Sequence, residues 1–200
     1  MKARAGPSKR DRRKEISPRF HKRGYENFRL ARSRILREAQ RMSLEKVKSV
    51  PELAAISAQF AAAGKKLVFT NGCFDLLHAG HVRYLQHARA LGDALLVALN
   101  GDASVRALKG PTRPINNEAD RAEVLAALAC VDFVTVFHTV RVTDIAGIIR
   151  PHIYAKGGDY TVESLDPGER GALQEVGAEI RILPLVPGKS TTAIIEKWRH

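Results

Sequence analysis

The sequence predicts an α/β protein with a single doubly wound parallel sheet of five strands. Short apolar segments rich in strand-forming residues alternate along the chain with segments whose apolar residues recur at helical spacing. This alternation implies right-handed crossovers and a parallel sheet covered by helices on both faces. The chain has 200 residues, of which 44% are hydrophobic, so it is long enough to bury the core that this architecture requires.

The first predicted helix of this domain begins at a capping box. Ser49 is followed by Pro51 in the first turn and by Glu52 three residues on, so a helix should run to about Ala63 and end at Gly64. Apolar runs predict strands at 66–70, 94–99, 133–137, 153–155 and 179–183. Amphipathic spacing predicts helices between and after them, at 82–91, 118–128, 142–149, 169–176 and 191–198.

The net positive charge is confined to the N-terminal quarter of the chain. Residues 1–50 contain 17 Lys or Arg and 5 Asp or Glu, whereas the rest of the chain contains 16 of each. We therefore interpret residues 1–42 as a basic extension that precedes a globular domain at residues 43–200.

The basic extension carries few branched apolar residues. Its composition predicts disorder over residues 3–23 and a weak helix over 28–42. Three interpretations stay open: a surface that binds nucleic acid or an anionic membrane, a solvated appendage, or a start codon assigned upstream of Met42.

Composition argues against several classes of protein. No apolar run approaches the roughly 18 residues of a membrane span, and the N-terminal charges are not followed by the apolar region of a secretory signal. The only cysteines, Cys73 and Cys130, lack the spacing of a zinc site, so a reduced cytoplasmic enzyme without disulfides is the simplest interpretation. Cys73 as a nucleophile is an alternative that no neighbouring catalytic signature supports.

The most informative segment is the strand-to-helix turn at residues 70–81. Backbone N–H groups and the positive end of a helix dipole favour an anion at such a turn, and glycines let the backbone approach it closely. His78 and His81 are three residues apart at the helix start, so they can point the same way. The segment predicts a phosphate site whose candidate residues are Thr70, Asn71, Gly72, Phe74, Asp75, His78, Gly80 and His81.

Polar and glycine-containing segments also follow the other predicted strands. Because the carboxyl ends of parallel strands share one edge of a sheet, these segments should converge on the same site. Lysines and arginines suit a chain of phosphates, although each segment alone is equally typical of a solvated turn or a helix cap. The additional candidates are Asn100, Asp102, Lys109, Arg113, Arg121, Lys156, Gly157, Asp159, Ser190, Thr191 and Thr192.

The motif Gly-x-Phe-Asp-x-x-His-x-Gly-His at 72–81 resembles the signature of the cytidylyltransferase-like nucleotidyltransferases, which join an NTP to a phosphorylated small molecule. This resemblance implies a Rossmann-like fold with its site beside the first strand. Lys109-Gly-x-x-Arg113, Lys156-Gly-Gly-Asp-Tyr160 and Ser190-Thr-Thr192 are similar to the adenylyltransferases that make ADP-heptose from heptose 1-phosphate and ATP. The likeness covers roughly residues 43–199.

A second resemblance is to the glycerol-3-phosphate cytidylyltransferases. The chain has Leu185-Val-Pro-Gly188 where that family has Arg-Thr-x-Gly, and Ala129 where that family has an arginine three residues before the aspartate equivalent to Asp132. Both departures favour the adenylyltransferase. A cytidylyltransferase acting on glycerol 3-phosphate or a similar polyol phosphate is the alternative.

The resemblance implies transfer of AMP from ATP to a sugar 1-phosphate, without a covalent intermediate. It gives the catalytic role to His78, His81 and Lys109. It gives nucleotide and phosphate binding to Thr70, Asn71, Gly72, Phe74, Gly80, Arg113, Arg121, Ser190, Thr191 and Thr192. It gives acceptor binding to Asp75, Asn100, Asp102, Lys156, Gly157 and Asp159, with Phe74 and Asp75 also shaping the loop.

The resemblance also implies the cofactor and the partners. Mg²⁺ would be held mainly by the nucleotide phosphates. A separate sugar kinase would supply the acceptor, and a homodimer is a further partner hypothesis. A nucleic-acid-binding protein, acting through residues 1–41 with a degenerate domain behind them, is the alternative from another class.

Overall fold

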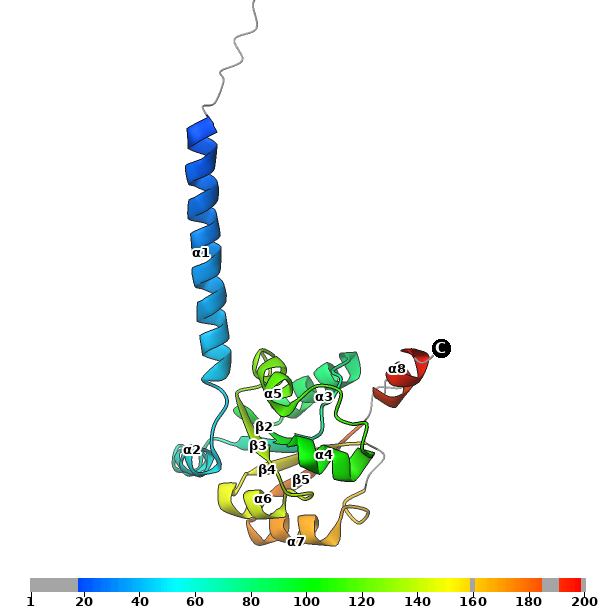
Figure 1. The fold of residues 1–200 in the computed structure, drawn as a ribbon. Coiled ribbons are helices and arrows are strands. Elements are labelled where there is room, and N and C mark those ends of the chain that lie inside the picture. The colour runs from blue at the N-terminus through cyan, green and yellow to red at the C-terminus, as the bar shows by residue number, and fades with distance from the viewer. Residues whose placement is uncertain (1–17, 159–160, 185–190, 199–200) are drawn as a thin grey trace, which may run out of the picture. The chain divides into compact units, whose positions relative to one another are not determined.

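The computed structural model describes residues 18–158, 161–184 and 191–198. The chain divides into two compact units, residues 1–39 and 40–200, and the second unit holds a five-stranded parallel sheet of strand order β3-β2-β1-β4-β5 (Figure 1). The predicted doubly wound parallel sheet is confirmed.

The order of the strands determines where a ligand is expected. The strands run over Leu67–Gly72 (β1), Ala94–Asn100 (β2), Phe133–Phe137 (β3), Ile153–Gly157 (β4) and Glu179–Leu183 (β5). Central β1 pairs with β2 on one side and with β4 on the other. The direction of winding therefore reverses between β1 and β4, and open α/β sheets form a crevice at the carboxyl ends of the strands at such a point.

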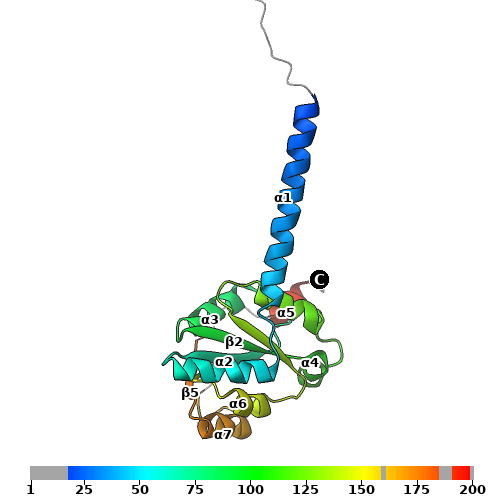
Figure 2. The ribbon, with the colours of Figure 1, turned by 90° about the vertical axis from the view of Figure 1, so that its left-hand side faces the viewer.

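Helices cover both faces of the sheet. They run over Val50–Ala62 (α2), Ala79–Arg89 (α3), Asp102–Lys109 (α4), Glu118–Ala126 (α5), Thr143–Ile149 (α6), Pro167–Glu175 (α7) and Thr191–Trp198 (α8). Leu53, Ile149 and Leu173 from α2, α6 and α7 join the buried cluster on one face. Leu85 of α3 and Leu125 of α5 join the cluster on the other, so the sheet lies between two apolar layers. Figure 2 shows the helices on both sides of the sheet.

Helix α4 is an element that the sequence analysis did not predict. The backbone N–H of Asp102, at the helix start, donates to Glu118 Oε2 at 2.8 Å. A Cβ added to the preceding Gly101 would lie 2.5 Å from His138 Nδ1, so the chain enters the helix through a tight tertiary contact. Local periodicity does not reveal such contacts. Because α4 ends at Lys109, this residue belongs to a helix and not to a loop.

Two strands extend two residues further than predicted, and the difference affects the site. β1 continues to Gly72 and β4 to Gly157, each two residues beyond the predicted end. Asn71 and Lys156 therefore lie on rigid strands at the edge of the crevice. Residues in strands hold a side chain in place more firmly than residues in loops do.

The N-terminal region contains one long helix, α1, over Pro18–Leu44. α1 covers the weak helix predicted over 28–42 and also residues 18–23 of the segment predicted to be disordered, and both stay predictions. Arginine, lysine and glutamate have high helix propensity as well as being typical of disordered segments. The rest of the segment predicted to be disordered lies outside the described residues. None of the helices described is long and apolar enough to cross a membrane.

Candidate functional site

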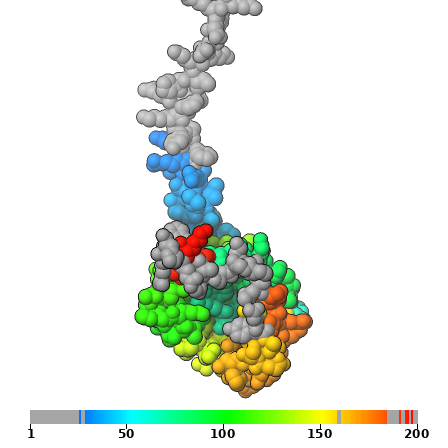
Figure 3. Space-filling view, turned by 90° about the vertical axis from the view of Figure 1, so that its right-hand side faces the viewer, coloured from blue at the N-terminus to red at the C-terminus, as the bar shows by residue number. Residues whose placement is uncertain are grey.

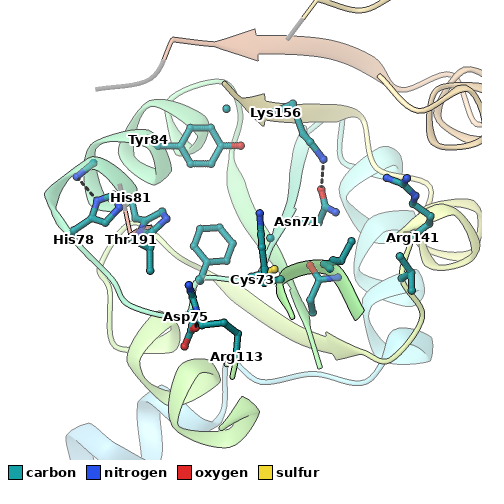
Figure 4. A pocket seen from close by; sticks show the side chains of 18 of the residues that line it. Asn71, Cys73, Asp75, His78, His81, Tyr84, Arg113, Arg141, Lys156 and Thr191 are labelled. Atoms are coloured by element: carbon teal, nitrogen blue, oxygen red, sulfur yellow. Dashed lines mark hydrogen bonds and ion pairs between the residues drawn. The ribbon is translucent and has the colours of Figure 1, made fainter. Parts of the chain in front are cut away.

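A cavity of about 520 Å³ lies at the carboxyl ends of the strands, where β1 and β4 are neighbours (Figure 4). Figure 3 shows the face of the molecule on which α4 (green) and α7 (orange) are exposed; both helices contribute residues to the cavity. The predicted residues that line it are Asn71, Gly72, Phe74, Asp75, His78, Gly80, His81, Asn100, Lys109, Arg113, Lys156, Gly157 and Thr191.

His78 caps the N-terminus of α3. Its backbone is extended, and its Nδ1 accepts a hydrogen bond from the backbone N–H of Gly80 at 3.1 Å. An imidazole nitrogen that accepts carries no proton, so the proton of this ring is on Nε2. His78 therefore presents one N–H donor at a helix N-terminus, where the dipole also favours an anion.

His81 stacks on His78, whereas the three-residue spacing predicted only that the two side chains can point the same way. The ring centroids are 3.9 Å apart and the rings are 21° from parallel, while Phe74 contacts His81 edge to face at 5.4 Å. Burial, and to a lesser degree the neighbouring His78, lowers the pKa of His81 to about 4. Within the described part of the chain, its buried Nδ1 has no hydrogen-bond partner. His81 is thus a neutral imidazole at pH 7.

The loop after β1 is fixed by Asp75, whose side chain is buried. The carboxylate accepts hydrogen bonds from the backbone N–H groups of Ile115 at 2.7 Å and Asn116 at 3.1 Å, and it forms an ion pair with Arg113. These contacts connect the loop to the segment before α5. They occupy the carboxylate within the protein, and the loop-shaping and acceptor-binding roles of Asp75 stay predictions.

The backbone of this loop is tightly folded around Phe74. Phe74 has a φ of 42°, in the left-handed region that residues other than glycine seldom adopt. A Cβ added to Gly72 would lie 2.9 Å from the Phe74 ring. Glycine is therefore required at residue 72 for Phe74 to reach the histidines.

Arg121 is almost fully buried and lies behind the site, outside the cavity lining. Its guanidinium donates to the backbone oxygens of Cys73 at 2.6 Å, Asn100 at 2.9 Å and Asn116 at 2.9 Å, and it pairs with Asp102 at 2.7 Å. The predicted roles of Arg121 in phosphate binding and of Asp102 in acceptor binding have no support in this geometry. Both residues connect the loops that form the cavity.

Thr70 also lies behind the cavity wall. It is fully buried, and its hydroxyl is 2.7 Å from the hydroxyl of Tyr84, which in turn donates to the backbone oxygen of Ala155 at 3.0 Å. A Cβ on Gly157 would lie 2.7 Å from the Tyr84 ring. Thr70 thus helps to connect β1, α3 and β4, and no face of it is exposed to a ligand.

The remaining predictions concern the C-terminal segments. Thr191 lines the cavity and its hydroxyl donates to the backbone oxygen of Leu76 at 3.3 Å. Thr192 lies in α8, but its side chain is not among those described. Asp159 and Ser190 lie outside the described residues.

Cys73 lines the cavity as a thiol. Burial is the main cause that raises its pKa above the ordinary value, so the nucleophilic thiolate is disfavoured. The geometry therefore agrees with the prediction that no thiol chemistry takes part.

Several lining residues were not predicted. They are Tyr84, Leu108, Val140, Arg141 and Glu169. Arg141 lies in the segment after β3, so the rule that ligands bind at the carboxyl ends of strands was sufficient to find it. Glu169 lies in the first turn of α7, where a carboxylate is typical of any helix start, so no sequence pattern marks it as a site residue.

Comparisons with known proteins agree with this arrangement. Residues 69–197 match the family model described as cytidylyltransferase-like. The bifunctional protein HldE of Pelobacter propionicus is 50% identical over 152 residues, which are 76% of this chain and 31% of that protein. The HldE of Geotalea uraniireducens is 51% identical over 154 residues, 77% of this chain and 31% of that protein. This chain thus spans less than a third of the length of these relatives.

A solved structure supports the same assignment. A lipopolysaccharide core biosynthesis protein from Thermoplasma volcanium GSS1 superimposes with a TM-score of 0.51 and 28% sequence identity, over 62% of this chain and 98% of that one. The family match begins in β1, ends in α8 and includes the stacked histidines and the loops around them. The chain therefore belongs to the cytidylyltransferase-like family and is a nucleotidyltransferase.

Proposed function

We propose that this protein transfers AMP from ATP to a sugar 1-phosphate, and that the acceptor is heptose 1-phosphate. The observation that carries the proposal is the identity of about half of all residues to the HldE proteins across the nucleotidyltransferase domain. The sequence resembles the adenylyltransferase that occurs as one half of a bifunctional kinase/adenylyltransferase. A structural neighbour in lipopolysaccharide core biosynthesis is consistent with a sugar nucleotide as product.

The reaction needs positioning and charge stabilisation more than covalent chemistry. A phosphate oxygen of the sugar phosphate attacks the α-phosphorus of ATP, the bond to the β-phosphate breaks, and pyrophosphate leaves. The Nε2–H of His78 and the neutral imidazole of His81 lie at the N-terminus of α3, where they can donate to phosphoryl oxygens that gain charge. Lys109 at the end of α4 would offset the charge of the triphosphate.

We propose that Mg²⁺ arrives with the nucleotide and is held mainly by its phosphates. Among the described residues, no group of three or more His, Cys, Asp or Glu side chains could hold a metal ion. Asp75, the carboxylate of the first loop, is already occupied by Arg113 and two backbone N–H groups. This donor set suits an ion that keeps water and phosphate ligands.

The proposed reaction also implies partners. The relatives are named as bifunctional, and the sugar 1-phosphate that the proposed reaction consumes would be the product of a sugar kinase. ATP as substrate and the two free cysteines favour a cytoplasmic location.

The experiment that tests the proposal is a substrate matrix. The protein is incubated with Mg²⁺, each NTP in turn and a panel of sugar and polyol phosphates, and pyrophosphate is measured. We expect release with ATP and heptose 1-phosphate. Release only with CTP and glycerol 3-phosphate would replace our proposal with the cytidylyltransferase. The nucleic-acid alternative is favoured if no pair reacts and the protein instead binds RNA. That binding should fall steeply with salt and be lost in a chain without residues 1–41.

A further inference from the structure

Four polar side chains form one hydrogen-bonded cluster. Figure 4 shows two of them, Asn71 and Lys156, on the side of the cavity opposite the histidines. Asn71 lies at the end of β1, Tyr154 and Lys156 lie on β4, and Glu169 lies in the first turn of α7. Asn71 Oδ1 is 2.7 Å from the Tyr154 hydroxyl, which also contacts Glu169 Oε1. Asn71, Lys156 and Glu169 line the cavity.

Lys156 determines how the amide of Asn71 is oriented. Its ammonium group has three N–H donors and no acceptor. These donors meet Asn71 Oδ1 at 3.2 Å, the Tyr154 hydroxyl at 3.0 Å and Glu169 Oε1 at 3.1 Å. A flipped amide would turn its own N–H donors toward the ammonium, which is unfavourable. The oxygen of Asn71 therefore faces Lys156, and its Nδ2 donors are the ones available to a ligand.

The charge of the cluster indicates what kind of ligand group it suits. Glu169 is only 4% exposed, and its negative charge is balanced by Lys156, so the cluster is neutral as a whole. A phosphate is bound best by uncompensated positive charge. A hydroxyl group needs one donor and one acceptor close together, and the Asn71 amide and the Glu169 carboxylate provide this combination at the cavity wall.

We propose that this cluster binds hydroxyl groups of the acceptor's sugar. Asn71 donates to a hydroxyl oxygen and Glu169 accepts from a hydroxyl, while Lys156 and Tyr154 are positioning residues that act through them. This inference rests on the proposed function for the identity of the acceptor. It assigns Asn71 to acceptor binding, whereas the resemblance implied nucleotide binding. It also makes the role of Lys156 in acceptor binding an indirect one.

The kinetic test compares Lys156→Met with a matched control, Lys48→Met. Lys48 also lies near a glutamate, Glu52 of α2, at 3.7 Å, but it precedes that helix and the pair is partly exposed to solvent. We expect Lys156→Met to raise the KM for heptose 1-phosphate by about tenfold, with kcat and the KM for ATP changed less than about threefold. Lys48→Met should behave as wild type. An unchanged acceptor KM, or an equal rise in the KM for ATP, would overturn the proposal.

A second arm separates hydroxyl recognition from a general loss of fit. Monodeoxy analogues of heptose 1-phosphate are compared in the wild type and in Lys156→Met. Removing the hydroxyl that contacts the cluster should lower kcat/KM of the wild type about tenfold. The same removal should lower kcat/KM of Lys156→Met much less, because this variant has already weakened the contact. If every analogue loses the same factor in both proteins, the cluster recognises no hydroxyl.

Lys156→Met leaves Glu169 buried without its partner and can impair folding. The double variant Lys156→Met/Glu169→Gln removes both charges and keeps the volume, so it serves as a second test with the same expected rise in acceptor KM. A folded double variant with the wild-type acceptor KM would contradict the proposal.

A binding measurement distinguishes this inference from the proposed function. The side-chain amide signals of Asn71, identified by their loss in Asn71→Asp, are followed by NMR in ¹⁵N-labelled protein. We expect them to shift on addition of heptose 1-phosphate and not of inorganic phosphate, whether or not transfer to ATP occurs. An equal shift with inorganic phosphate would make the cluster a phosphate site.

Discussion

The two histidines of the motif have different environments, and their chemistry follows from this difference. His78 is held by the backbone N–H of Gly80, so its donor is on Nε2. His81 is more deeply enclosed, between His78 and Phe74, and its pKa is lowered to about 4 by burial and by the adjacent ring. The two rings are therefore neutral before substrate binds, and this avoids the repulsion that two stacked cations would have.

Replacing His81 with alanine should lower kcat by about 10²–10⁴, because it removes a donor aimed at charge that develops in the transition state. His87→Ala, on the exposed side of α3, is the matched control and should keep wild-type turnover. The measurement is steady-state pyrophosphate release, with thermal unfolding to check the fold. Near wild-type turnover in a folded His81→Ala protein would remove His81 from the catalytic group.

The lowered pKa of His81 also predicts how stability depends on pH. In the unfolded chain this imidazole binds a proton as pH falls through 6.5, whereas in the folded protein it does so only near pH 4. Between these values the unfolded state binds more protons, so acidification destabilises the protein. Urea unfolding at pH 7 and pH 5 should show a larger loss of stability for wild type than for His81→Gln. Equal losses would show that His81 titrates normally.

Cys73 should be dispensable for chemistry although it lines the cavity, since burial keeps its thiol protonated. We expect Cys73→Ser to retain activity within about tenfold of wild type, with Cys130→Ser, outside the cavity lining, as the control. If alkylation or replacement of Cys73 abolishes turnover while nucleotide still binds, the direct-displacement mechanism needs a covalent step.

At the scale of elements, buried ionic side chains hold the loops of the site in register. Asp75 connects the loop after β1 to residues 115–116, and Arg121 of α5 connects that same loop to the end of β2. The sequence rule that basic residues near a phosphate site bind phosphate assigned Arg121 to the ligand. In the structure its guanidinium instead donates to three backbone oxygens of these loops and to the Asp102 carboxylate.

Arg121→Met should lower the free energy of unfolding by about 3 kcal/mol, because it leaves several buried oxygens without donors. Arg41→Met is the matched control: Arg41 pairs with Glu45 at 3.4 Å on an exposed surface, where such pairs contribute about 0–1 kcal/mol. Urea denaturation measures both. Arg121→Lys should not restore stability, since an ammonium cannot span the same oxygens. Equal effects at the two positions would contradict the role of Arg121 as a connector.

At the scale of the whole molecule, what could be predicted depended on whether the signal was local. Strands β3 and β5 were predicted to the residue, since both are short segments rich in strand-forming residues between clear breaks. The capping box at Ser49 likewise fixed the start of α2. The start of α4 and the enclosure of Glu169 depend on partners distant in sequence, namely Glu118 and Lys156, so no window of the sequence contains them.

The junction between the basic region and the domain is visible in the hydrogen bonds. Lys48 N–H donates to Val134 O at 2.8 Å, Val134 N–H donates to Lys46 O at 2.9 Å, and Lys46 Nζ reaches Val131 O at 2.8 Å. Residues 46–48 thus extend the sheet at β3. By contrast, Leu30, Ile35 and Leu36 of α1 are at least 60% exposed, so their burial contributes little to the stability of the chain.

A chain that begins at Met42 should therefore fold cooperatively and keep kcat/KM within about threefold, or roughly 0.7 kcal/mol of transition-state stabilisation. It retains the contacts of Lys46 and Lys48 with the sheet and loses the exposed hydrogen bond between Gln40 and Glu123.

A chain that begins at Ser49, which also lacks residues 46–48, is the matched control and should be less stable, because the edge of β3 then loses its partner. Light scattering and pyrophosphate release test both chains. If the chain from Met42 is insoluble or changes its oligomer mass, the apolar residues of α1 dock on a second subunit, and the N-terminal region is a structural element of the enzyme.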